Sequence, residues 1–344
     1  MFSKAMLPIE KQVQTWVELG NIPGAVLEVS LGGQFAWHKS WGSYSDGRMQ
    51  RPITRSTIFD AASLTKVTAT LPAILLLAKC SQLSLDDKVQ RYIPGFLHEQ
   101  VTLRQLLQHT SGLPADLPRI DRYEQRDVIQ DILQQELVST AGTQVLYSDL
   151  GFILLGAIIE ELTQQTISAF VEHEVFTPLG MRDSRFQPVA SLRERIAATE
   201  ADGDGFIVGA VHDEKCFQLG GASGSAGLFT TAADLVQYAK SWLTVDDTLL
   251  SRRQRQECVA APFQGRGLGW EVWQGQSVVP SCSAAWPIGS YGHTGFTGTS
   301  IWIEPRNELI VVFMTNAIHY GRSNPIRQLR PLLHEAIYSS LIGD

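Results

Sequence analysis

The sequence predicts an α+β fold arranged as an α/β sandwich. A central antiparallel sheet is built from both ends of the chain, is flanked by terminal helices and carries a large helical insertion. Three observations predict it: strand patterns lie near both ends, residues 63–242 have mostly helical periodicity, and 44% of the 344 residues are hydrophobic. Because neither set of strands is large enough to be stable alone, one shared sheet is the economical arrangement.

The N-terminal part is typical of a helix followed by a hairpin. Residues 8–19 repeat apolar side chains at helical spacing. Residues 25–30 are the first predicted strand, a Gly-Gly turn follows, and residues 34–41 return as the second strand.

The middle of the chain is predicted to be helical, with loops rich in Gly, Pro and Asp. Predicted helices cover residues 64–81, 103–108, 126–137, 150–162, 167–176 and 232–243. The Gly- and Ser-rich stretch 220–227, which precedes the last of them, is predicted to be flexible.

The C-terminal part returns to strands. They are predicted over residues 267–273, 290–294, 299–303 and 309–315, before a closing helix over 324–341. The last strand contains a continuous apolar run, as expected for a strand buried on both faces. We therefore expect a sheet domain of residues 1–60 and 245–344, a helical domain of residues 61–244, and a site between them.

Composition limits the classes of function. A net charge of −7 and the lack of a basic run disfavour nucleic-acid binding, and no apolar run approaches the length of a membrane span. The four cysteines are scattered, which predicts neither disulfides nor a zinc site. No secretory signal is visible at the N-terminus, so we expect a cytoplasmic protein with no nucleic-acid or membrane partner.

The first candidate for chemistry is the pair Ser63 and Lys66. Their i, i+3 spacing at the start of a predicted helix places both side chains on one face. A lysine there can take the proton of a serine nucleophile, and the helix N-terminus offers N–H groups to an oxyanion. Alone, the motif has little specificity, and Ser63 as a helix cap is an equally good interpretation.

Two further motifs follow. Tyr147, Ser148 and Asp149 precede a predicted helix, where a capping role with a packed tyrosine is the alternative. The sequence Tyr-Gly-His-Thr-Gly-Phe-Thr-Gly over residues 291–298 places glycines at a strand end, where a ligand can approach the backbone; a hairpin turn with a surface histidine is the alternative.

Together the three motifs resemble those of the serine β-lactamase and penicillin-binding protein superfamily. The order and spacing are most similar to the class C branch, which includes β-lactamase-like esterases. Segments 102–113, 147–156 and 227–235 also look like that branch, and the resemblance covers residues 9–340. It implies a sheet domain beside a helical domain with the serine at their boundary.

The resemblance also implies roles for individual residues. Ser63 would be the acylated nucleophile, Lys66 its proton-transfer partner and Tyr147 a second acid/base. The oxyanion hole would consist of the backbone N–H groups of Ser63 and Phe296. The residues expected to bind the substrate are Asp149, His293, Thr294 and Gly295. No metal or other cofactor is implied.

Two departures from the family pattern bear on the substrate. His293 stands before Thr294 and Gly295 where the family has lysine, and a histidine of ordinary pKa is mostly neutral at pH 7. A neutral side chain at this position would bind a substrate carboxylate weakly, which favours neutral esters or amides as substrates. Asp149 stands where an asparagine would donate a hydrogen bond to substrate, so we expect Asp149 to pair with Lys66 and to make Tyr147 the general base.

The sequence therefore predicts a serine hydrolase that acts through an acyl-enzyme on an ester or amide of a small molecule or peptide. The alternatives are a true β-lactamase or D,D-carboxypeptidase and, from another class, a non-catalytic binding or sensor protein. His109 is expected to support the turn after it, and His212 with Asp213 to lie in a polar loop or line the cleft. The sequence does not predict an oligomeric state.

Overall fold

The computed structural model describes residues 2–33, 35–118, 121–244, 247–276 and 278–343. The first residue of the strand predicted over 34–41 lies outside the described residues. So do residues 1, 119, 120, 245, 246, 277 and 344 of the predicted domain ranges.

A seven-stranded antiparallel sheet forms the centre of the described structure, in the order β3-β2-β1-β11-β10-β9-β8. Its strands are β1 (Gly24–Leu31), β2 (Phe35–Ser45), β3 (Gln50–Pro52), β8 (Glu271–Val272), β9 (Tyr291–Thr294), β10 (Ser300–Glu304) and β11 (Leu309–Thr315). β1 pairs with β11 from Ala25 opposite Thr315 to Leu31 opposite Leu309. The prediction of one sheet built from both chain ends is confirmed.

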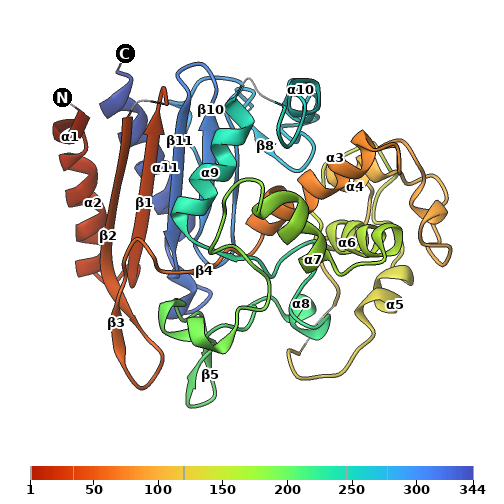
Figure 1. Cartoon of the computed structure of the whole chain (residues 1–344), viewed down its shortest axis with the longest axis horizontal. Coiled ribbons are helices and arrows are strands. Elements are labelled where there is room, and N and C mark those ends of the chain that lie inside the picture. The colour runs from red at the N-terminus through yellow and green to blue at the C-terminus, as the bar shows by residue number, and fades with distance from the viewer. Residues whose placement is uncertain (1, 34, 119–120, 245–246, 277, 344) are drawn as a thin grey trace.

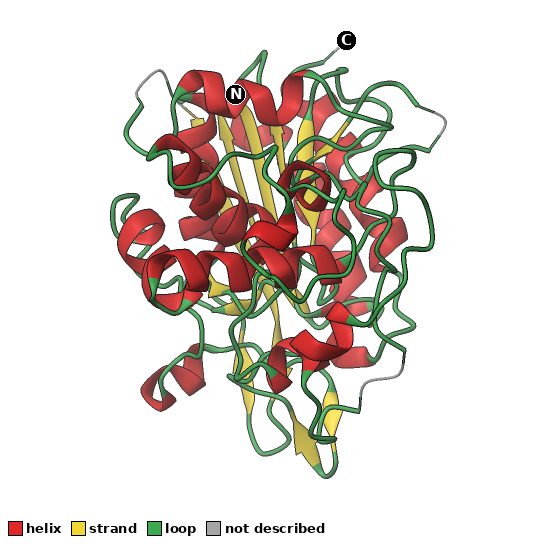
Figure 2. Ribbon diagram, turned by 90° about the vertical axis from the view of Figure 1, so that its right-hand side faces the viewer, coloured by secondary structure: helices red, strands yellow, loops and turns green. Residues whose placement is uncertain are grey.

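Helices cover both faces of the sheet (Figures 1 and 2). On one face α1 (Phe2–Ala5), α2 (Leu7–Glu18) and α11 (Ile326–Leu341) pack together. They enclose an apolar cluster with the sheet, in which Trp286 and Trp302 are buried. On the other face α9 (Ala232–Leu243) packs against β1 and β11. The predicted helical range 61–244 thus includes one helix that lies on the sheet.

The helical part stands beside the sheet (Figure 1). It is centred on α6 (Asp149–Thr163), which packs against α3, α4, α5 and α7. The other elements of this part are η1 (Lys66–Thr70), α3 (Leu71–Lys79), η2 (Val89–Arg91), α4 (Leu103–Leu107), α5 (Val128–Leu133), α7 (Ile167–Val171), η3 (Glu172–Phe176), η4 (Ala190–Arg195) and α8 (Glu214–Gln218).

Two short strand pairs and two short helices complete the described elements. They are β4 (Phe59–Asp60) with β7 (Phe229–Thr230), β5 (Ala201–Asp202) with β6 (Gly205–Phe206), α10 (Arg252–Ala260) and η5 (Ala317–Tyr320). The β4–β7 pair joins the segment before Ser63 to the chain that leads into α9.

Several predicted boundaries are wrong. The helix predicted over 64–81 begins at residue 64 as predicted but ends at Lys79, and it contains one turn of π-helix, η1, before α3; the helix predicted over 126–137 is confined to α5. The strand predicted over 267–273 is only β8, because Gly269 has a φ of +75° and the Gly267 N–H bonds the Trp270 carbonyl. α10 was not predicted, since its first half is almost entirely polar.

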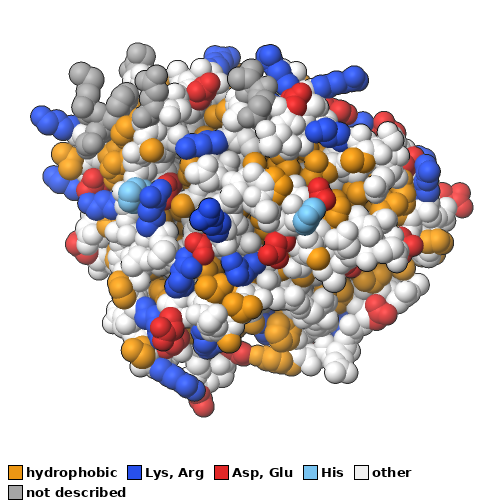
Figure 3. Space-filling view, viewed as in Figure 1, with side chains coloured by type: hydrophobic (Ala, Val, Ile, Leu, Met, Phe, Trp, Pro, Cys, Tyr) orange, Lys and Arg blue, Asp and Glu red, His pale blue; other side chains and the backbone are white. Residues whose placement is uncertain are grey.

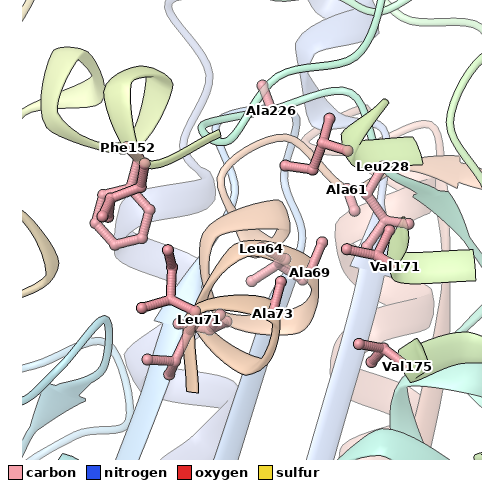
Figure 4. Packing of buried hydrophobic residues seen from close by; sticks show 14 of the residues in the cluster. Ala61, Leu64, Ala69, Leu71, Ala73, Phe152, Val171, Val175, Ala226 and Leu228 are labelled. Atoms are coloured by element: carbon pink, nitrogen blue, oxygen red, sulfur yellow. The ribbon is translucent and has the colours of Figure 1, made fainter. Parts of the chain in front are cut away.

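Close packing fixes the helical turn that follows Ser63 (Figure 4). Leu64 and Leu71 are fully buried, and Phe152, Val171 and Leu228 belong to the same cluster. Because buried side chains interdigitate at close to crystal density, this turn has little freedom to shift. Among the described residues, no single helix is long and apolar enough to cross a membrane.

Candidate active site

Ser63 follows a constrained turn at the end of β4. Ala62 has a φ of +47°, and its N–H donates to Asp60 Oδ1 at 2.9 Å. A non-glycine residue in this region costs about 1–3 kcal/mol and needs support from its surroundings. Ser63 Oγ accepts no backbone N–H from a described residue, so the alternative of a helix cap is not supported. The side chain instead lines a pocket.

Lys66 lies one turn further on and is completely buried. Its Nζ is 3.1 Å from Ser63 Oγ, 2.9 Å from the Ser225 carbonyl and 2.7 Å from Asp149 Oδ1. Burial disfavours the ammonium form, but the charge of Asp149 and the phenol of Tyr147 outweigh it, so the pKa of Lys66 is raised. The expected approach of Lys66 to Ser63 and its pairing with Asp149 are both confirmed.

The loop 220–227 is packed rather than flexible. A Cβ on Gly224 would lie 1.9 Å from the Phe152 carbonyl, so only glycine lets the loop pass α6. The Gly224 carbonyl accepts from Thr70, and the Ser225 carbonyl accepts from Lys66. The glycines that suggested flexibility are therefore required by close contact.

Tyr147 faces the same pocket from the loop before α6. Lys66 Nζ is 5.2 Å from the centre of its ring. The Tyr147 hydroxyl is buried and has no hydrogen-bond partner among the described residues. Since buried polar groups are normally satisfied, this hydroxyl is left available to a substrate or a water molecule.

His109 holds Tyr147 in place, a role that sequence reasoning missed. Its ring stacks on that of Tyr147 at 4.4 Å between centres, and its Nδ1 accepts the Ser148 N–H at 3.1 Å. Burial, with the nearby Arg266 and Lys66 charges, lowers the pKa of His109 far below its ordinary value. A neutral ring can accept this bond, whereas an imidazolium could not.

Asp149 lies between two buried lysines. Lys215 of α8 is 3% exposed, and its Nζ lies 3.6 Å from Asp149 Oδ2, 3.2 Å from Asp213 and 2.8 Å from Asp116. Burial alone would raise the pKa of Asp149, but Lys66 and Lys215 outweigh it and lower that pKa. Asp149, a predicted substrate contact, is not among the described residues that line the pocket.

His293 and Gly295 form the opposite wall of the pocket. His293 Nδ1 is 2.8 Å from the Thr294 carbonyl, which assigns the proton to Nδ1, and its Nε2 is buried without a partner in the described structure. Burial and the Arg266 charge lower the pKa of His293 far below 6.5, so the ring is neutral as expected.

Gly295 brings β9 close to the serine turn. A Cβ at this position would lie 2.1 Å from Thr299 Oγ1 and 2.5 Å from the Ala61 carbonyl. Thr297 and Thr299 donate hydroxyl bonds to the carbonyls of Asp60 and Ala61, which clamps the two segments together.

The two predicted oxyanion donors lie at this clamp. Ser63 and Phe296 both line the pocket. Neither backbone N–H donates to any described residue, so both are available to a substrate oxygen. The Phe296 side chain is 46% exposed, and its ring stacks against His212, which pairs with Glu200. The stacked His212 ring thus helps to hold the Phe296 side chain in place.

The pocket has a volume of about 570 Å³ and is rich in arginine. Its lining consists of Ser63, Tyr147, Arg266, Glu271, Ser281, His293, Thr294, Gly295, Phe296, Arg322, Asn324, Ile326, Arg327 and Arg330. Arg330 donates to the Gly295 and Thr299 carbonyls, and Arg322 pairs with Glu200 and Glu214. In the described part of the chain, no group of three or more His, Cys, Asp or Glu side chains could hold a metal ion.

Comparison with known proteins agrees with this geometry. The family model described as Beta-lactamase matches residues 9–334. A protein of Escherichia coli (strain K12) named "Putative D-alanyl-D-alanine carboxypeptidase" is 30% identical over 373 residues, which cover 95% of this chain and 85% of that protein.

Two solved structures share the fold. "EstCE1, a hydrolase with promiscuous acyltransferase activity" has a TM-score of 0.76 and 21% identity, covering 97% of this chain and 99% of that one. A class C β-lactamase has a TM-score of 0.78 and 22% identity, covering 99% of this chain and 98% of that one.

Proposed function

The chain belongs to the β-lactamase family, and on this premise we propose that it is a serine hydrolase that forms an acyl-enzyme on Ser63. One observation carries the proposal: the ammonium of Lys66 lies 3.1 Å from Ser63 Oγ at a pocket that also holds Tyr147. A protein that only binds ligands needs neither a nucleophile nor two proton carriers beside it.

Acylation begins with attack of Ser63 Oγ on the substrate carbonyl. Because Asp149 holds Lys66 as the ammonium, Tyr147 is the proposed general base, and the Lys66 ammonium lies 5.2 Å from the centre of its ring. The negative charge that develops on the carbonyl oxygen is stabilised by the N–H groups of Ser63 and Phe296.

The intermediate collapses when Tyr147 returns the proton to the leaving group. A water molecule then gives a proton to Tyr147 and attacks the acyl carbonyl. This second intermediate collapses by breaking the bond between the acyl carbon and Ser63 Oγ, which takes the proton back from Tyr147. The products are the free acid and the original Ser63 hydroxyl. The substrate is an ester or amide of a small molecule or peptide.

Esterase activity is the first candidate, and the fold shared with EstCE1 supports it. D-alanyl peptidase activity is the second, favoured by the 30% identity with the E. coli protein of that name. A cytoplasmic location remains a prediction that cell fractionation would test.

The test uses three probes: a p-nitrophenyl ester, a chromogenic cephalosporin and a D-alanyl dipeptide. Turnover is followed by absorbance or product analysis, and adducts are followed by intact mass. Ser63→Ala is expected to abolish both turnover and adduct, because it removes the proposed nucleophile, whose Oγ lies 3.1 Å from Lys66 Nζ. Ser323→Ala, at an exposed serine, is the matched control.

The outcomes separate the candidates. Fast cephalosporin turnover would indicate a β-lactamase, and a lasting β-lactam adduct without turnover would indicate a penicillin-binding protein. Full activity in Ser63→Ala would refute the proposed nucleophile. Absence of both turnover and adduct with all probes would favour a binding protein.

A further inference from the structure

We propose that Asp60 is a positioning residue that holds both N–H donors of the oxyanion hole in place. This inference rests on the proposed function, because it concerns how Ser63 and Phe296 are aimed at the substrate carbonyl oxygen. Asp60 is not among the described residues that line the pocket, so it would act only through its neighbours.

Asp60 is buried at the end of β4, just before the turn that carries Ser63. Acidic side chains usually lie at the surface, as on the face shown in Figure 3, where they are interspersed with basic ones. Asp60 is instead only 2% exposed. Burial of a carboxyl group is costly unless its oxygens are hydrogen-bonded, so the bonds that Asp60 makes indicate which segments it holds.

The first donor is fixed through Ala62, the residue before Ser63. Asp60 Oδ1 accepts the Ala62 N–H at 2.9 Å. The φ of Ala62 is +47°, a conformation that alanine adopts only with support from its surroundings. Asp60 supplies this support one peptide before the Ser63 N–H. Loss of the bond would let the turn relax and would rotate that N–H away from the pocket.

The second donor is fixed through Thr297, the residue after Phe296. The Thr297 hydroxyl donates to the Asp60 carbonyl at 2.7 Å. The ring of Phe296 also stacks on His212, whose backbone N–H donates to Asp60 Oδ2 at 2.7 Å. Asp60 therefore holds the Phe296 segment both directly and through His212.

Asp60 is thus a common partner of segments that are far apart in the sequence. It joins the Ser63 turn to the loop before α8 and to the loop between β9 and β10. An oxyanion hole stabilises the developing charge when its donors point to one oxygen position. Because Asp60 is bonded beside each donor, it sets the distance and the angle between them.

The first test is Asp60→Asn, which keeps the size of the side chain but leaves one acceptor oxygen for two N–H groups. We expect kcat for a p-nitrophenyl ester to fall by roughly 10- to 100-fold, as for a small misplacement of catalytic groups, with little change in KM. The matched control is Asp46→Asn. Asp46 also accepts two backbone N–H bonds, from Arg48 and Met49, but lies outside the pocket, so kcat should not change.

A second readout reports on the oxyanion hole itself. Sulfur is larger than oxygen and accepts hydrogen bonds weakly, so an intact hole favours an ester over the matching thionoester. The ratio of kcat/KM for the p-nitrophenyl ester to kcat/KM for its thionoester should fall in Asp60→Asn but not in Asp46→Asn. A loss of folded protein would lower both rates equally and leave this ratio unchanged.

A change at Ala62 tests whether support of the turn is the cause. Glycine adopts positive φ without strain, so adding Ala62→Gly to Asp60→Asn should restore part of the lost kcat and of the ratio. If Asp60→Asn does not fold, Thr297→Val takes its place, because it removes only the hydroxyl bond to the Asp60 carbonyl. It is expected to lower the same ratio.

A wild-type kcat in Asp60→Asn would overturn the role of Asp60. So would a fall in kcat without a change in the ester to thionoester ratio, or an unchanged ratio in Thr297→Val where Asp60→Asn does not fold. Absence of any rescue by Ala62→Gly would overturn the support of the Ser63 turn. The proposed function fails separately, because ester turnover that survives in Ser63→Ala refutes the nucleophile whatever Asp60 does.

Discussion

Replacement of Asp149 by asparagine tests the charge arrangement behind Ser63. The change keeps the size of the side chain and removes one negative charge between Lys66 and Lys215. At an effective dielectric constant of about 20, unit charges 2.7 Å and 3.6 Å apart attract by about 6 and about 5 kcal/mol. Desolvation offsets much of this, and breaking a buried pair typically costs about 3–5 kcal/mol.

The expected loss of stability in Asp149→Asn is therefore about 3–5 kcal/mol at neutral pH. The folded-state pKa of Asp149 is lowered, so its stabilising contribution is present above the ordinary value of 3.8 and lost as the pH falls through the folded value. The pKa of Lys66 is raised, so its contribution is present below 10.5 and lost only above that. The deficit should thus be full at pH 7 and shrink in acid.

The rate should respond as well. Without the carboxylate, the pKa of Lys66 falls, and the limb of the pH–rate profile that depends on the Lys66 ammonium moves to lower pH. Chemical denaturation at pH 7 and at a pH well below 3.8, and a kcat profile with a p-nitrophenyl ester, measure the two effects. Asp86→Asn, at an exposed pair with Arg104, should cost less than about 1 kcal/mol.

The reasoning is refuted if Asp149→Asn has the wild-type pH–rate profile and loses less than about 1 kcal/mol at pH 7. That result would mean that Asp149 does not set the charge of Lys66. The reason for assigning the general base in acylation to Tyr147 rather than to Lys66 would then be lost.

Three further changes test the supports of the site. Gly295→Ala forces a Cβ against Thr299, so we expect a loss of about 1–3 kcal/mol in the free energy of unfolding by denaturant, together with a fall in kcat. A wild-type kcat would contradict the close approach of Gly295 to the serine turn. His109→Leu leaves the Ser148 N–H buried without its acceptor, which should cost about 1–3 kcal/mol and lower kcat with little change in KM; an equal effect on both constants would argue against a positioning role for Tyr147. Lys215→Met leaves three carboxylates without a shared cation and should cost about 3–5 kcal/mol at pH 7, with a smaller loss at pH 4, whereas a pH-independent loss would indicate packing alone.

Local patterns were sufficient to predict the sheet, whereas the core of the site was predicted from the resemblance of three motifs to a known family. The apolar run of β11 and the hairpin of β1 and β2 indicated one sheet, because neither set of strands was large enough alone. The spacing of three residues predicted that Ser63 and Lys66 lie close together, because one helical turn separates them, and the resemblance supplied their roles.

The supports of the site could not be predicted in the same way. Lys215 pairs with Asp149, and Arg266 lies over the ring of Tyr147. The partners in each contact are far apart in the sequence, so local periodicity does not predict them. The prediction of a flexible loop was wrong at Gly224, because a sequence does not distinguish a glycine required by close packing from a glycine in a flexible loop. His109 was assigned to its own turn because its ring contact with Tyr147 is long-range.

The pairing of β1 with β11 has a consequence for how the protein reaches its native state. Thr315 Oγ1 donates to the Gly24 carbonyl across 291 residues, so the centre of the sheet closes only after nearly the whole chain has been synthesised. Until then β1 has one unpaired edge, which is prone to pair with other chains. Such non-local contacts slow folding, and a nascent chain that lacks β11 would need protection from aggregation.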